Sequence, residues 1–308
     1  MLDVRRMRVL REVAARGSFS AAAEALSFTQ SAVSQHVAAL EREAGVRLVE
    51  RGPRGVRLTE AGRALVSHAD AILARIEDAE EELAAIAGLR GGRLRLASFQ
   101  SAGATLVPRA VAAFRGRHPR VELGMVEAEP DDATERLRTG DIDLAVVYDF
   151  EAIPGMLAPE LELTHLIDDP YDAILPKDHP LAERPSLSLS ELAEEPWIAS
   201  TSGCGCRRIT ERACEGAGFE PRVAFEADET MSAQAFVAAG VGVTMMPQLA
   251  LTTLHPSVVT RSLGAGPPVR RIWAARLADG YRSAASEAMV QILRNVADEF
   301  REGELAAA

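Results

Sequence analysis

The chain has 308 residues, of which 47% are hydrophobic, and a formal net charge of −11. A chain of this length and composition can fill two or three domains, so the sequence predicts a globular multidomain protein. The Arg-rich N-terminus and the three closely spaced cysteines exclude a signal peptide and a secreted disulfide framework, and the longest weakly polar run, residues 235–247, is too short to span a bilayer. We therefore expect a cytoplasmic protein without a membrane span.

The first 63 residues predict a small, basic, helical domain. They carry 11 arginines against 7 acidic residues, a net charge of +4, whereas the rest of the chain carries −15. Contact with phosphate is therefore expected from this segment. Gly17 ends a first helix, and Ser18 caps a second helix that runs to Leu26. The first helix is indicated by apolar residues at helical spacing, which are Met7, Leu10 and Val13.

A third helix is predicted to follow the cap residue Thr29. Its apolar stripe consists of Val33, Val37 and Leu40. Its first turn is unusually polar and contains Gln30, Ser31, Ser34 and Gln35. Such side chains can contact base edges or phosphates when a helix lies in the major groove of DNA. The alternative is a surface helix whose polar first turn only solvates the cap.

Two short alternating runs follow within residues 46–59, on either side of a turn formed by residues 52–55. This pattern predicts a β-hairpin, or wing. Three short helices with a wing are typical of proteins that lay one helix in the major groove. The predicted contacts to double-stranded DNA are Thr29, Gln30, Ser31, Ser34, Gln35, Arg51 and Arg54.

The run from Ser18 to Leu65 resembles the DNA-binding segment of LysR-type transcriptional regulators almost position for position. The matching residues are Ala22, Ala23, Leu26, Thr29, Gln30, Ala32, Val33, Ser34, Leu40, Glu41, Gly45, Leu48, Arg51, Leu58, Thr59, Ala61 and Gly62. The family usually has other residues at Ser31, Gln35 and Val49, so its base preferences do not carry over. The resemblance implies a homodimer or homotetramer that binds an interrupted inverted repeat under the control of a small effector, with RNA polymerase as a candidate partner.

A long helix is predicted from Thr59 to Ile86. Its apolar residues follow a 4-3-4-3 rhythm that keeps one stripe facing a partner helix, which predicts a dimer seam. The alternative is a helix packed on the chain's own core, but charged residues occupy nearly everything off the stripe. The predicted seam contains Leu65, Ala69, Ile72, Ile76, Ala79, Leu83 and Ile86.

From residue 93 onward, short apolar strands alternate with helical segments, which predicts a parallel sheet with helices on its faces. The expected helices lie near residues 106–117, 131–139, 207–217 and 231–239. The expected fold class is α/β: an all-α winged helix-turn-helix and linker helix, then a two-lobed effector domain that the resemblance likens to periplasmic binding proteins. The predicted parts are a DNA-binding domain over residues 1–58, a dimerisation helix over 59–87, a hinge over 88–92, and an effector domain over 93–303, with lobe I formed by 93–160 and 267–303 and lobe II by 161–266.

Hydroxyl-rich loops at residues 98–101 and 200–203 are the candidate effector site, because ligands of α/β sheets bind at strand ends and helix N-termini, where N–H groups favour anions. The resemblance places a small effector of unknown identity in the cleft between the lobes. The alternative is that these residues are only caps and turn formers. The candidate ligand-binding residues are Ser98, Phe99, Gln100, Ser101, Tyr148, Thr201, Ser202, Phe225 and Met246.

The sequence contains no HExxH, GxSxG or P-loop motif and no His/Cys set with metal spacing. We therefore expect no catalysis, no metal and no cofactor. The alternative from another class is a cytoplasmic enzyme or small-molecule-binding protein with an appended DNA-binding domain.

The cysteines leave a second alternative, a thiol-redox-sensing regulator, because peroxide-sensing members of the family use two cysteines in the corresponding region. The candidates are Cys204, Cys206 and Cys214. If one straight helix joins the last two, their Cα atoms lie about 12 Å apart, and a disulfide between them would have to unwind that helix. The competing interpretations are that the cysteines are small buried hydrophobes, or that the first two only close a loop.

Overall fold

The structure is a computed structural model that describes residues 1–52, 55–86, 92–264, 266–301 and 303. The chain divides into two compact units: an N-terminal unit of Met1–Gly92 with Glu135–Asp143, and a C-terminal unit of Arg93–Thr134 with Leu144–Ala308. Each unit has a hydrophobic core of its own. Within the described ranges, no helix has both the length and the apolar character that a membrane span requires.

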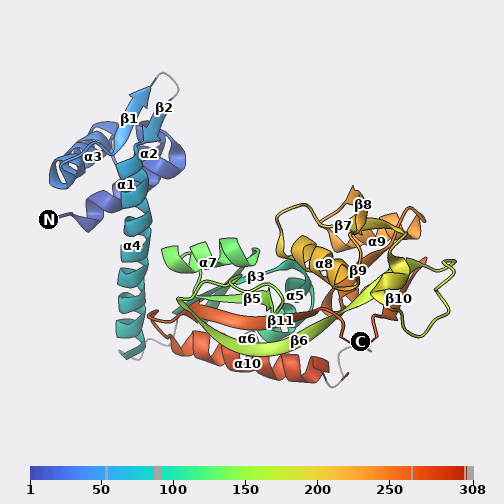
Figure 1. The fold of residues 1–308 in the computed structure, drawn as a ribbon. Helices are drawn as coiled ribbons and strands as arrows, with labels where there is room; N and C mark the ends of the chain where they lie inside the picture. Colours follow the sequence, from blue (N-terminus) through green and yellow to red (C-terminus); the bar gives the residue numbers. More distant parts are fainter. Residues whose placement is uncertain (53–54, 87–91, 265, 302, 304–308) are drawn as a thin grey trace. The chain divides into compact units, whose positions relative to one another are not determined.

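Three short helices, a hairpin and a long helix form the N-terminal unit, as predicted (Figure 1). Local sequence sets the helix ends, since Ser18 and Thr29 accept hydrogen bonds from backbone N–H groups of the turns that follow them. Gly17 ends the first helix with φ of 61°, a conformation that favours glycine. The elements are α1 (Val4–Arg16), α2 (Phe19–Ala25), α3 (Gln30–Ala44), β1 (Val49–Gly52), β2 (Gly55–Leu58) and α4 (Glu60–Ile86).

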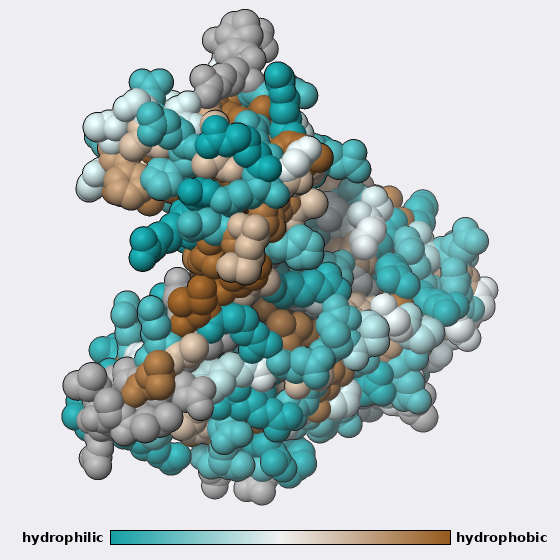
Figure 2. Space-filling model, turned by 90° about the vertical axis from the view of Figure 1, so that its left-hand side faces the viewer, coloured by the Kyte–Doolittle hydropathy of each residue, from teal (hydrophilic) through white to brown (hydrophobic). Residues whose placement is uncertain are grey.

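The predicted seam on α4 has two different environments. Its first two residues, Leu65 and Ala69, pack into the core of the N-terminal unit, because α1 lies against the first half of α4. For these two residues the prediction of a partner helix was wrong. The next four residues of the stripe are exposed, and the side chain of Ile86 lies outside the described residues. Those four are Ile72, Ile76, Ala79 and Leu83, and Figure 2 shows the apolar band that runs along this helix.

The C-terminal unit is built on one large sheet with the strand order β10-β6-β11-β5-β3-β4, to which β9 adds by pairing with β6. A second sheet consists of β7 and β8. Two helices, α6 (Leu106–Arg117) and α10 (Ala284–Arg301), pack together on one face of the large sheet (Figure 1). The strands are β3 (Gly92–Ser98), β4 (Val121–Glu127), β5 (Leu144–Phe150), β6 (Leu161–Pro176), β7 (Pro196–Ala199), β8 (Arg222–Glu226), β9 (Thr244–Pro247), β10 (Val258–Ser262) and β11 (Val269–Leu277).

The expectation of a parallel sheet is only partly met. β3 pairs with β5 in parallel and β7 with β8 in parallel, but β11 is antiparallel to both β5 and β6. The long strand β6 pairs with β11 up to Pro170 and with β9 and β10 from Tyr171 onward. The predicted lobe boundary at residues 160–161 thus falls at the start of β6, whereas the change of partners lies ten residues later. We use lobe I for the β3-β4-β5-β11 side of this change and lobe II for the β7-β8-β9-β10 side.

The longer helices of the C-terminal unit were predicted from the sequence, whereas several short elements were not. The helices α7 (Pro130–Thr139), α8 (Gly205–Gly216) and α9 (Thr230–Ala238) lie where the apolar pattern predicts them. The prediction missed strand β10 and the five-residue helix α5 (Gln100–Ala104), which is too short to show a helical period. It also missed the 3₁₀ turns at Leu189–Leu192 and Gln248–Leu251.

Candidate functional site

The first turn of α3 presents a polar edge to solvent. Oγ1 of Thr29 accepts a hydrogen bond from the backbone N–H of Ala32 at 3.2 Å, which satisfies one of the free donors of the helix N-terminus. The polar residues of this turn are exposed, except for the half-buried Ser34: they are Gln30, Ser31, Ser34 and Gln35. On the opposite face, three residues are at most 1% exposed, namely Val33, Val37 and Leu40. The helix is therefore held from behind while its polar turn stays accessible.

Two residues of the segment that resembles LysR-type regulators, Glu41 and Gly62, hold the wing in place. Oε1 of Glu41 accepts hydrogen bonds from the backbone N–H groups of Leu48 at 2.8 Å and Val49 at 3.2 Å, which ties the end of α3 to the start of β1. A Cβ atom on Gly62 would lie 2.0 Å from the carbonyl oxygen of Leu48, so this crossing requires glycine. The orientation of the wing relative to α3 is thus set by backbone contacts.

The two predicted arginine contacts belong to this hairpin. Arg51 lies in β1, paired with Val56, while its side chain and the whole of Arg54 lie outside the described residues. Phe28, which was not among the predicted contacts, is 48% exposed and stacks on His36 at 5.8 Å between ring centroids. Its ring adds an apolar surface beside the polar edge of α3.

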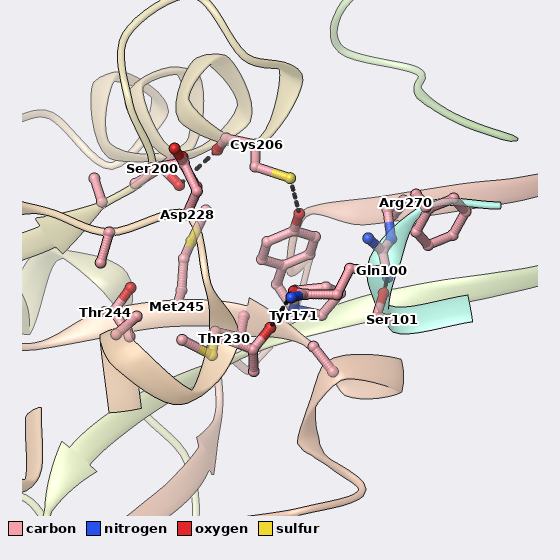
Figure 3. Close-up of a pocket in the computed structure, with 18 of the residues that line it drawn as sticks. Gln100, Ser101, Tyr171, Ser200, Cys206, Asp228, Thr230, Thr244, Met245 and Arg270 are labelled. Carbon is pink, nitrogen blue, oxygen red and sulfur yellow. Dashed lines mark hydrogen bonds between the residues drawn. The ribbon is translucent and has the colours of Figure 1, made fainter. Parts of the chain in front are cut away.

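A cavity of about 110 Å³ lies between the lobes of the C-terminal unit (Figure 3). Gln100 of α5 reaches across it: its side-chain amide bonds to the carboxylate of Glu229 and accepts a hydrogen bond from Oγ1 of Thr230 at 3.3 Å. Five of the predicted ligand-binding residues line this cavity, namely Phe99, Gln100, Ser101, Tyr148 and Met246. The structure thus brings residues of both lobes to one small space.

The wall of this cavity contains a buried ion pair that the sequence did not reveal. Arg270 and Asp169 are each 3% exposed, and Nη2 of the arginine donates to Oδ2 of the aspartate at 2.7 Å and to Oγ of Ser101 at 2.8 Å. The guanidinium lies over the rings of Phe99 and Tyr148, at 4.7 and 5.1 Å from their centroids. Burial opposes the charge of Arg270, but the adjacent carboxylate outweighs this effect and raises its pKa.

Two further carboxylates of the cavity wall, Glu129 and Asp228, were not predicted, and both accept hydrogen bonds from predicted residues. The hydroxyl of Tyr148 donates to Glu129 at 2.7 Å, and burial, reinforced by Cys206 and Glu129, raises the pKa of this tyrosine. Asp228 accepts hydrogen bonds from the backbone N–H of Thr201 at 2.9 Å and from its hydroxyl. Further lining residues that the prediction did not include are Tyr171, Ser200, Thr230, Thr244 and Met245.

Four of the predicted ligand-binding residues do not line this cavity. Ser98 is fully buried, and its hydroxyl donates to the carbonyl of Phe99 at 3.2 Å. Thr201 and Ser202 are exposed, the former engaged with Asp228 as described. Phe225 stacks on Phe236 in an exposed pair, with 5.1 Å between centroids. Each lies within two residues of a lining residue in sequence, but none of the four lines the cavity itself.

The three cysteines have free thiols and distinct environments. Cys204 is the cap residue of α8, and its sulfur accepts a hydrogen bond from the backbone N–H of Arg207 at 3.3 Å. Cys206 lines the cavity, with its sulfur 3.6 Å from the hydroxyl of Tyr148. Cys214 is buried in the core at the far end of the same helix.

Known proteins share both parts of this architecture. Residues 4–63 match the family model "Bacterial regulatory helix-turn-helix protein, lysR family", and residues 87–298 match "LysR substrate binding domain". The chain is 33% identical to the probable HTH-type transcriptional regulator LrrA of Synechococcus elongatus, over 97% of this chain and 99% of that protein.

Two solved structures show the same fold. Full-length OxyR from Pseudomonas aeruginosa is 23% identical with a TM-score of 0.75, and the alignment covers 96% of this chain and 95% of that one. Full-length CbnR complexed with its target DNA is 21% identical with a TM-score of 0.71, covering 96% and 100%. The helix-turn-helix domain and the two-lobed domain both match models of one family. The chain therefore belongs to the LysR family of DNA-binding transcriptional regulators.

Proposed function

We propose that this regulator reads DNA bases with the first turn of α3 and changes its hold on DNA when a small molecule occupies the cavity between the lobes. The exposed polar turn of α3, anchored by its buried opposite face, is the observation that carries the proposal. The amides of Gln30 and Gln35 can each donate to and accept from an adenine edge. The hydroxyls of Ser31 and Ser34 suit bases or phosphates, and Arg51 and Arg54 suit phosphates next to the wing.

A second copy of the chain covers the exposed part of the α4 stripe in this proposal. The stripe is apolar and narrow, which suits a helix of the same sequence. A twofold dimer presents two recognition helices, and two such helices require a DNA site with matching inverted symmetry. Contacts between effector domains would extend the dimer to a tetramer. We place this assembly in the cytoplasm, with its DNA, and we assign no catalytic step to it.

The cavity selects a small, polar effector. Its positive charge, Arg270, is already paired with Asp169, and the carboxylates of Glu129 and Asp228 also line the space. A ligand with several negative charges would therefore meet net repulsion. The side chain of Gln100 bridges the lobes, so an effector that displaces it would change the relation of lobe I to lobe II.

The test of DNA reading is the variant Gln30→Ala. Loss of one bidentate contact should lower the discrimination between the specific site and random DNA by about 1 to 3 kcal/mol. Fluorescence anisotropy on both DNAs at several salt concentrations measures this difference. Gln291→Ala, an exposed glutamine on α10, is the matched control and should leave both affinities unchanged. Equal losses on specific and random DNA would show that Gln30 does not read bases.

A further inference from the structure

A second, larger cavity lies in the C-terminal unit, apart from the cavity between the lobes. Its volume is about 650 Å³, against about 110 Å³ for the first, and it is open to solvent. Small-molecule sites in proteins usually have volumes of about 300 to 1,000 Å³. Its walls are the second half of α8, residues 188–189, the segment that leads from β10 to β11, and residues 151–152 directly after β5. The cavity therefore has room for a ligand of ordinary metabolite size.

The wall of this cavity is mostly apolar and is not filled by the chain's own side chains. Three of its residues are at most 9% exposed, namely Leu189, Ile209 and Leu263. On α8, a Cβ atom added to Gly216 would meet no atom within 4 Å. The other apolar lining residues are Ala152, Ala213, Ala217, Pro267, Pro268 and Val269. Because an apolar wall in contact with water is unfavourable, a ligand with an apolar body would gain free energy by covering it.

Two charged residues also line the cavity, and only one of them faces an opposite charge elsewhere. The pKa of Arg271 is raised mainly by its hydrogen bond to Asp149 and further by the charge of Glu151, so the carboxylate of Glu151 lies near a cation. In the part of the chain that the structure describes, the guanidinium of Arg212 forms no hydrogen bond and no ion pair. The cavity thus offers one uncompensated positive charge beside an apolar wall.

We propose that this cavity is a second ligand site, which binds a small amphipathic monoanion. Its hydrocarbon body would cover the apolar wall, and its single carboxylate would accept hydrogen bonds from Arg212, whose planar guanidinium matches a carboxylate in geometry. A second negative charge on the ligand would be repelled by Glu151. The ligand class differs from that of the first cavity, whose wall is polar and whose arginine is already paired with Asp169.

The two cavities use neighbouring residues of the same two segments. On α8, Ile209 lines the second cavity and Thr210 the first; at the start of β11, Val269 lines the second and Arg270 the first. A ligand in the second cavity would thus contact residues that are directly bonded to two wall residues of the first. This position suits a second regulatory signal. The site itself does not rest on the proposed effector or on DNA reading, because its test needs neither.

Three probes with the same apolar body and different charges test the proposal: phenylbutyrate, phenylbutanol and phenylbutylamine. Isothermal titration calorimetry on the full-length protein should show the tightest binding for the carboxylate and the weakest for the amine. Arg212→Gln should weaken phenylbutyrate by about three- to fivefold, as expected for an exposed ion pair, and leave phenylbutanol unchanged. The control is Arg208→Gln, an exposed arginine one turn earlier on α8 that does not line the cavity, and it should change neither affinity.

Hydrogen–deuterium exchange locates the bound probe. Phenylbutyrate should slow amide exchange most within residues 188–189 and 212–217, which line only the second cavity, and not within 99–101 or 227–228, which line only the first. Ala213→Phe should abolish binding of all three probes by filling the space, whereas Ala224→Phe, at an exposed position on β8, should not. If Ala213→Phe does not fold, the Arg212→Gln titrations and the exchange map of the unmodified protein decide.

Three outcomes would overturn the proposal. They are the absence of saturable phenylbutyrate binding, equal affinity of phenylbutyrate for the Arg212→Gln variant and the unmodified protein, and protection centred on residues 99–101 and 227–228. The last outcome would place the probe in the cavity between the lobes, so it would exclude the second site and leave the proposed effector site standing.

Discussion

Replacement of Arg270 by methionine should destabilise the effector domain strongly. The substitution keeps an apolar chain over the rings of Phe99 and Tyr148 but removes both hydrogen bonds to Oδ2 of Asp169, at 2.7 and 3.1 Å. The carboxylate stays buried, and among the described residues its other oxygen retains only the backbone N–H of Leu249, at 2.9 Å. Removing one partner of a buried ion pair costs about 3 to 5 kcal/mol, because the remaining charge has lost its compensation. With an m value of about 3 kcal/mol per M, the urea midpoint should fall by roughly 1 to 1.7 M.

Urea unfolding followed by tryptophan fluorescence measures this effect on the effector domain alone. Both tryptophans of the chain, Trp197 and Trp273, lie in the C-terminal unit. The double variant with Asp169→Asn removes the stranded charge and should recover at least about 2 kcal/mol. The control is Arg301→Met, which breaks a surface pair with Asp298 and should cost less than about 1 kcal/mol. A loss below 1 kcal/mol for Arg270→Met, or strictly additive effects in the double variant, would refute the reasoning.

Three further predictions concern the wing, the dimer and the thiols. Gly62→Ala should destabilise the DNA-binding domain by about 1 to 3 kcal/mol in thermal unfolding, because the new Cβ atom would lie 2.0 Å from a backbone carbonyl oxygen. The control Gly116→Ala places its Cβ in open space and should be tolerated. Ile76→Asp, at a position 39% exposed in the single chain, should split the dimer as measured by light scattering, whereas Ser67→Asp on the opposite face of α4 should not. An intact Ile76→Asp dimer would refute the prediction that this stripe forms the dimer interface. The rate of Cys204 alkylation should rise as pH passes the lowered pKa of this thiol, about 6, and level off above pH 7, because the reactive thiolate is protonated below that pKa. A rate that keeps rising to pH 9 would contradict the lowered pKa.

The local pattern of the sequence was sufficient for the DNA-binding domain. The cap residues Ser18 and Thr29, the stop at Gly17 and the stripe at Val33 act over a few residues of chain, and the structure places all of them as predicted. The ends of α6 were also predicted, because its apolar period is regular over three turns. Helix ends and amphipathic faces depend on interactions between near neighbours, which a single sequence displays directly.

The cavity and the strand directions depended on tertiary structure. Arg270 and Asp169 are 101 residues apart, and neither has a sequence signature that distinguishes a buried ion pair from two surface charges. The same limitation applies to β6, a single strand of 16 residues whose two halves pair with different strands. It applies again to Leu65 and Ala69, whose heptad spacing suits either a partner helix or the chain's own core. Spacing determines which face of an element is apolar, but only the packing of distant segments determines what covers that face.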